Sequence, residues 1–186
     1  MTKNNLILII LVMILCMTGL AASEADSDGA EKVEKIFTDL TLNDPQSGTA
    51  EISISSDDFN SWLAVKARDR DYIRDISVGF RDNNEADLSM DMDISKVEDE
   101  GYYAAMLSTM FEGHQLLKAA GTIKVAEGHF SFVINSLSIN EVIVTPALVA
   151  PLVSMLLPDY DLTKPLELPH GITDIRTSEG VLTIKR

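Results

Sequence analysis

The chain has 186 residues, of which 46% are hydrophobic and 24% charged, and its formal net charge is −14. A field this acidic repels phosphate backbones, which excludes nucleic acid as a partner. The only cysteine, Cys16, lies within the first 23 residues, so the rest of the chain has neither a disulfide nor thiol chemistry. The length suits one domain with a core of its own.

Residues 1–23 have the layout of an export signal. Lys3 precedes an apolar run from Leu6 to Ala22 that is interrupted only by Thr18 and Gly19. The run has 17 residues, fewer than the roughly 20 that an untilted helix needs to cross a bilayer. We therefore predict a cleaved signal peptide and an extracytoplasmic protein, secreted or held in the cell envelope. Retention of the segment as a marginal N-terminal membrane anchor is the alternative.

Small and acidic residues at 24–30 indicate a solvated spacer before a single α+β domain at 31–186. In that domain, apolar residues recur at helical spacing along 33–40, which predicts a helix. Apolar and polar residues alternate along 49–54, which predicts a strand. A second helix then begins with Ser55 or Ser56 as its cap. Apolar and polar residues next alternate along 76–80 and 87–94, which predicts an antiparallel hairpin with one polar face.

The segment 103–110 fits a helix or a strand, because short apolar runs are ambiguous. A second hairpin follows at 117–125 and 130–139. The spacing of its apolar residues changes from two to three between Ile134 and Leu137, which predicts a β-bulge at Asn135–Ser136. Within it, Gly121 predicts strong bending or the close approach of backbone.

Thr145 and Pro146 open an apolar helix that runs to Leu156. Because this helix is apolar on nearly all sides, it is either enclosed by the protein or in contact with lipid. The chain ends with a short hairpin at 172–184.

These elements predict an α+β fold in which a long, curved antiparallel sheet wraps around one or two apolar helices. Methionine side chains are flexible and suit an interior whose occupant varies in shape, although methionine is also an ordinary core filler. For Trp62, the only tryptophan, helical spacing beside Phe59 favours a place in the plain core, and contact with a ligand is the alternative. The candidate residues for an apolar groove are Phe59, Trp62, Leu63, Met90, Met92, Met106, Met110, Phe130, Phe132, Leu148, Leu152 and Met155.

No residue pattern points to catalysis. The three histidines, His114, His129 and His170, each lie beside a glycine and away from any nucleophile or zinc-ligand motif. Asp91 and Asp93 fall on the polar face of a regular strand, where solvation explains them. We therefore predict no enzymatic activity, no metal and no cofactor.

Several segments together resemble a known family. They are Ile52-x-Ile54 ahead of Phe59-Asn60-x-Trp62-Leu63, the turn at 125–132, Leu137-x-Ile139-Asn140 before Val144-x-Pro146, and Leu168-Pro169-x-Gly171-Ile172. This pattern, over most of 30–186, looks like the bacterial extracytoplasmic proteins of the YpmS and LmeA type. The resemblance implies a fold similar to one half of the tubular lipid-binding (TULIP) proteins, whose curved sheet wraps a helix and leaves an apolar groove. Residues 106–111 have no clear counterpart in that pattern.

The function expected from these observations is non-enzymatic binding of a lipid or another long apolar ligand in a groove between sheet and helices. Membrane contact through the N-terminal segment is compatible with it. A second hypothesis is a structural or regulatory envelope module that docks a protein partner and holds no ligand. A third is an accessory that presents lipid-linked substrates to a membrane enzyme.

Overall fold

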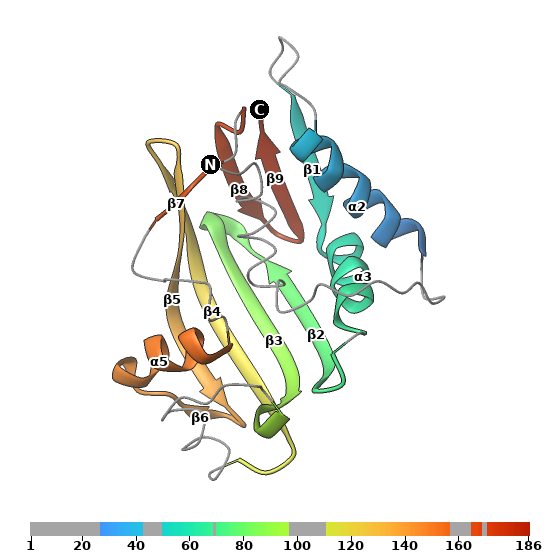
Figure 1. The fold of residues 1–186 in the computed structure, drawn as a ribbon. Helices are drawn as coiled ribbons and strands as arrows, with labels where there is room; N and C mark the ends of the chain where they lie inside the picture. The colour runs from blue at the N-terminus through green and yellow to red at the C-terminus, as the bar shows by residue number, and fades with distance from the viewer. Residues whose placement is uncertain (1–26, 43–49, 69, 97–110, 157–164, 169–170) are drawn as a thin grey trace.

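A computed structural model describes residues 27–42, 50–68, 70–96, 111–156, 165–168 and 171–186. The predicted signal segment 1–23 and the ambiguous segment 103–110 lie outside the described residues. The described chain has an α+β fold whose paired strands are antiparallel, as the alternation of residues predicts (Figure 1).

Among the described residues, most strands follow one another directly, and the three α-helices lie between or ahead of them. They are α2 (Ser27–Leu42), β1 (Glu51–Ser55), α3 (Ser56–Ala67), β2 (Ile73–Phe80), β3 (Glu85–Asp93), β4 (His114–Ala126), β5 (His129–Ile139), β6 (Val142–Ile143), α5 (Pro146–Leu156), β7 (Leu166–Glu167), β8 (Asp174–Ser178) and β9 (Val181–Lys185).

The strands fall into two sheets where the sequence predicted one. The larger sheet has the order β2-β3-β4-β5-β6, with β7 also paired to β5, and the smaller sheet has the order β1-β9-β8. Buried Thr177 of β8 fastens the smaller sheet to the β2–β3 turn, because its hydroxyl donates to the carbonyl of Arg81 at 2.8 Å. The amide of Thr177 also donates to Oδ1 of Asn84 at 3.0 Å.

All three predicted hairpins are present, and the predicted β-bulge is confirmed. Ala120 pairs with Ser136 whereas Gly121 pairs with Ile134, so Asn135 is the extra residue on β5. The amide Nδ2 of Asn135 donates to the Thr122 hydroxyl at 2.9 Å.

The start of each N-terminal helix follows from local chemistry. Ser55, one of the two predicted caps, accepts a hydrogen bond from the Asp58 amide at 3.1 Å and so ends β1 where α3 begins. Helix α2 starts at Ser27, which corrects the predicted spacer at 24–30: its last four residues are helical. The reason is that Ala30 joins the buried helical stripe that the sequence placed only from Val33 onward.

No helix among the described residues combines the length and the apolar character required to cross a membrane.

Gly121 confirms the predicted close approach. A Cβ at this position would lie 2.3 Å from Cζ of Phe132 and 2.7 Å from the carbonyl oxygen of Val133. We expect Gly121→Ala to lower the free energy of unfolding by about 1–3 kcal/mol, the usual cost of overpacking. Gly79→Ala is the matched control, because a Cβ there meets no heavy atom within 4 Å. Urea unfolding measures both variants, and equal stabilities would contradict this account of Gly121.

Candidate functional site

The larger sheet has two chemically different faces because successive side chains of a strand point to opposite sides. We call the face that carries Ile76, Val78 and Leu117 the inner face, and the opposite one the outer face. Helices α3 and α5 lie toward opposite ends of the sheet in Figure 1. The side chains of both helices join apolar clusters on the inner face.

The α3 end of the inner face holds a cluster of aromatic rings. The Trp62 ring lies 5.0 Å from the ring of Phe37 and 5.7 Å from that of Phe59, centroid to centroid. Phe59 in turn lies 5.3 Å from Phe80 of β2. Tilted contacts at these separations are favourable for aromatic pairs. Trp62 is only 2% exposed, so at this end the protein's own side chains fill the interior.

The polar edge of Trp62 is satisfied by a carboxylate from α2. Nε1 of Trp62 donates to Oε2 of Glu34 at 2.6 Å, and Nζ of Lys66 lies 3.0 Å from the same oxygen. Burial raises the pKa of Glu34, but the hydrogen bonds from Trp62 and Lys66 and the Lys66 charge outweigh it, so the pKa lies below its ordinary value. Helix α2 is therefore tied to α3 through an ionised group.

The α5 end of the inner face holds a second apolar cluster. Leu152 of α5 is buried there against strands β3, β4 and β5. Its buried neighbours are Met92, Ile94, Leu117, Leu137 and Ile139.

Between the two clusters lies a band of half-buried apolar residues, which we call the apolar strip. It consists of Ile73, Leu88, Met90, Ala119 and Ile134. Ile73, Met90 and Ile134 pack against both clusters. Leu88 lies directly opposite Ala119 on the neighbouring strand. The strip therefore connects the α3 end of the inner face to the α5 end without a charged residue.

The predicted groove residues divide among these regions. Phe59, Trp62, Leu63, Phe130 and Phe132 belong to the buried cluster at the α3 end, and Met92 and Leu152 belong to the cluster at the α5 end. Met90 alone lies in the strip, and Leu148 is 39% exposed. Met106 and Met110 lie outside the described residues; Met155 is helical, and its side chain is outside the description.

The outer face is polar, as predicted, and carries a shallow depression of about 290 Å³. Its lining comes from strands β2 to β5 and mixes small, hydroxyl, charged and apolar residues. They are Ser77, Gly79, Asp87, Leu88, Ser89, Lys118, Ala119, Ala120, Ser136 and Ser138. Because the depression is open to solvent and its lining includes the charged residues Asp87 and Lys118, it does not suit an acyl chain.

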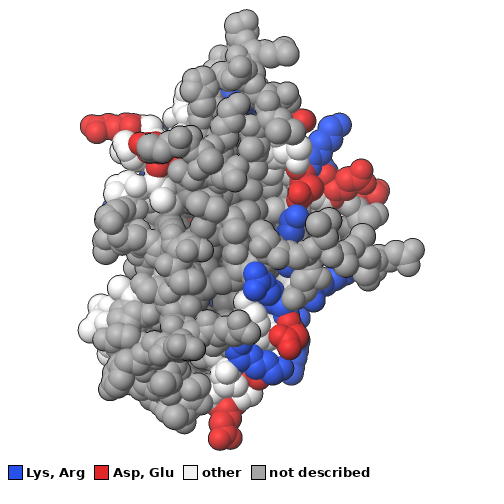
Figure 2. All heavy atoms as spheres, viewed as in Figure 1, with Lys and Arg blue, Asp and Glu red and all other residues white. Residues whose placement is uncertain are grey.

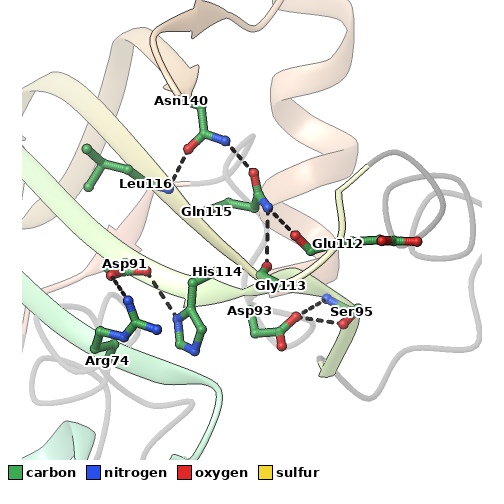
Figure 3. Close-up of polar contacts among 10 residues, drawn as sticks. All are labelled: Arg74, Asp91, Asp93, Ser95, Glu112, Gly113, His114, Gln115, Leu116 and Asn140. Carbon is green, nitrogen blue, oxygen red and sulfur yellow. Dashed lines mark hydrogen bonds and ion pairs between the residues drawn. The ribbon is translucent and has the colours of Figure 1, made fainter.

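A polar cluster lies where β3 ends and β4 begins (Figure 3). His114 and Arg74 both contact the carboxylate of Asp91, His114 through Nδ1 at 3.1 Å and Arg74 through Nη1 at 3.4 Å. The hydroxyl of Ser95 donates to Asp93 at 2.6 Å, and this hydrogen bond lowers the pKa of Asp93. Because the Ser95 proton is donated to a carboxylate, this arrangement is not that of a nucleophile activated by histidine. Over the described ranges, His, Cys, Asp and Glu do not group into a metal site.

A network of amides closes the same end of the sheet, as Figure 3 also shows. Buried Gln115 donates to the carbonyl of Glu112 at 2.8 Å and accepts from Nδ2 of Asn140. Oδ1 of Asn140 accepts from the amide of Leu116 at 2.9 Å. Sequence reasoning missed this network and the Glu34–Trp62 contact, because both join residues that lie more than 20 positions apart.

No protein-family model matches this chain, and no match was found among curated proteins or solved structures.

The lowered pKa of Glu34 predicts a pH dependence of stability. Its contribution is complete above the ordinary value of 4.5 and is lost as the pH falls through the lower pKa of the folded state. We expect Glu34→Gln to be less stable than wild type at neutral pH, with the difference vanishing toward about pH 3. Urea unfolding, monitored through the fluorescence of Trp62, measures this difference in stability at each pH. Glu31→Gln, exposed on the same helix, is the control. A Glu34→Gln difference that stays constant with pH would contradict the assignment.

Proposed function

We propose that this chain is an exported, non-enzymatic protein that binds a lipid or another long apolar ligand along the apolar strip. The observation that carries the proposal is that Leu88, Met90, Ala119 and Ile134 remain half-buried between two fully buried clusters. Covering such residues with a ligand is favourable by about 0.8 kcal/mol for each methylene buried. An acyl chain suits this surface because the strip offers no charged partner.

The chemistry of the strip supports a ligand of variable shape. Met90 has an unbranched, polarisable side chain that adapts to different neighbours. It packs against both clusters, so its movement would change the width of the strip at its middle. Ala119 leaves room beside Leu88 because its side chain is a single methyl group.

The proposal includes a sheet that curves around its ligand, as in one half of a TULIP protein. The bulge at Asn135 supports curvature because a bulged strand bends and twists more strongly. Gly121, beside the bulge and covered by the Phe132 ring, supports it as well. Kinship with proteins of the YpmS and LmeA type is part of the same proposal.

Export rests on residues 1–23, and the acidic character of the rest of the chain fits a protein that stays dissolved outside the cytoplasm. The lipid would then be met in the cell envelope or at a membrane surface. Presentation of a lipid-linked substrate to a membrane enzyme is a narrower form of the same function.

The main competing proposal is an envelope module that docks a protein and holds no ligand. The dense packing around Trp62 favours it, because five of the predicted groove residues belong to that buried cluster. The two proposals differ in whether lipid is bound to the protein as it is made in its own host.

Two neighbouring alanines on β4 provide a matched test. Both alanines border the outer depression, but Ala119 packs against the second cluster on the inner face, whereas the next residue, Ala120, points to the outer face. Native mass spectrometry of the protein from its own host is expected to detect bound lipid in wild type and in Ala120→Phe. Ala119→Phe should retain less than a fifth of it, because the ring occupies the strip.

Urea unfolding of both variants checks that they fold, since an added ring costs about 1–3 kcal/mol in a packed site. Ile134→Trp replaces Ala119→Phe if the latter is unfolded. Wild-type protein without lipid, or equal loss from both alanine variants, would overturn the proposal and favour the docking module.

A further inference from the structure

The segment 142–150, which we call the apolar tip, exposes an unusual amount of apolar surface. Val142 is 69% exposed, Ile143 78% and Leu148 39%. Pro146 and Ala147 between them are exposed as well. No Asp, Glu, Lys or Arg occurs between Glu141 and Asp159, although the chain carries a net charge of −14. A contiguous exposed apolar patch of this kind marks an interaction site.

The directions of these side chains identify the kind of partner. Val142 and Ile143 are consecutive residues of a strand, so they point to opposite sides of β6, and both are exposed. Pro146, Ala147 and Leu148 are consecutive in a helix, so they point around most of its circumference. Although Thr145 is exposed as well, the exposed apolar side chains point in several directions, so one flat protein surface does not cover them all. The tip therefore fits an apolar medium that can surround it.

Several backbone groups of the tip are already hydrogen-bonded within the protein, which favours an apolar medium. Strand β6 pairs with β5 across a two-residue turn in which Asn140 and Glu141 have positive φ. The amide of Val144 donates to the Leu137 carbonyl at 2.8 Å, and that of Leu148 donates to the Thr145 carbonyl at 2.9 Å. Pro146 has no amide proton to satisfy. These bonds lower the cost of removing the tip from water.

We propose that the apolar tip inserts into the interfacial layer of a lipid bilayer. In Figure 2, most of the visible Lys and Arg side chains lie on the α2, α3 and β2 side of the molecule. The sequence left open whether the α5 helix is enclosed or meets lipid; the proposal is that its first turn meets lipid while Leu152, one turn later, is enclosed.

The tip also adjoins the proposed ligand site. Val144 and Val149 are half-buried and pack against the second cluster, which the apolar strip reaches from the other side. An apolar path therefore leads from the tip to the strip. The inference rests on the proposed function in that it names a bilayer as the source of the lipid.

The test uses the full chain with Cys16→Ser, so that a single introduced cysteine carries a fluorophore whose emission depends on polarity. The probe is placed at Ile143→Cys in the tip. The matched control is Ala126→Cys, which is exposed at the end of β4, beside the turn at the other end of the β4–β5 hairpin. Vesicles of phosphatidylcholine are used, because the negative protein repels anionic lipid.

Vesicles are expected to shift the emission of the Ile143→Cys label to the blue, with at least a twofold gain in intensity, and nitroxide-labelled lipids should quench it. The Ala126→Cys label should stay unchanged. Adding Val142→Asp should abolish the response at Ile143→Cys without changing the thermal midpoint, because Val142 is exposed.

An Ile143→Cys label that keeps its aqueous spectrum while the protein sediments with vesicles would overturn the inference. So would a blue shift that appears without vesicles and grows with protein concentration, since it indicates a second copy on the tip. If native mass spectrometry detects bound lipid but the emission of the Ile143→Cys label does not respond to vesicles, the insertion of the tip is wrong and the proposed function stands. If the Ile143→Cys label responds to vesicles but native mass spectrometry detects no bound lipid, only the proposed function is wrong.

Discussion

The described fold depends on the alternation of apolar and polar residues along β2 to β5. Antiparallel pairing brings these alternations into register, which gives the sheet one apolar face that must be kept from water. Helix α3 meets this need with the aromatic cluster around Trp62, and α5 meets it with Leu152. The apolar strip lies between them, and its half-buried state is the basis of the proposed function.

Two features distinguish the inner face from an ordinary packed core. The strip joins two buried clusters without belonging fully to either, and the α5 cluster continues into an apolar tip that water surrounds. Exposed surface of this kind is costly unless it is covered by a partner. The proposed lipid would explain both features at once, because an acyl chain would cover the strip and a bilayer would surround the tip.

Sequence reasoning succeeded where the signal is local. The hairpins, the bulge at Asn135, the close approach at Gly121 and the Ser55 cap all follow from residue spacing within a few positions. It failed where distant segments meet. The smaller sheet pairs β1 with β9 from the far end of the chain, and Thr177 fastens it to the β2–β3 turn, more than 90 residues away. The indole N–H of Trp62 likewise donates to Glu34 of another helix. The apolar pair Val142 and Ile143 was visible in the sequence, but its exposure depends on the edge position of β6.

Photolabelling of the full chain with a fatty acid that carries a diazirine in its acyl chain tests the central claim most directly. The account predicts that peptide mapping finds the label on inner-face residues of β3, β4 and β5, with Leu88, Met90 and Ile134 foremost, and that unlabelled fatty acid competes it away. Label confined to the hydroxyl-lined outer face, or spread evenly without competition, would contradict a lipid site on the apolar strip.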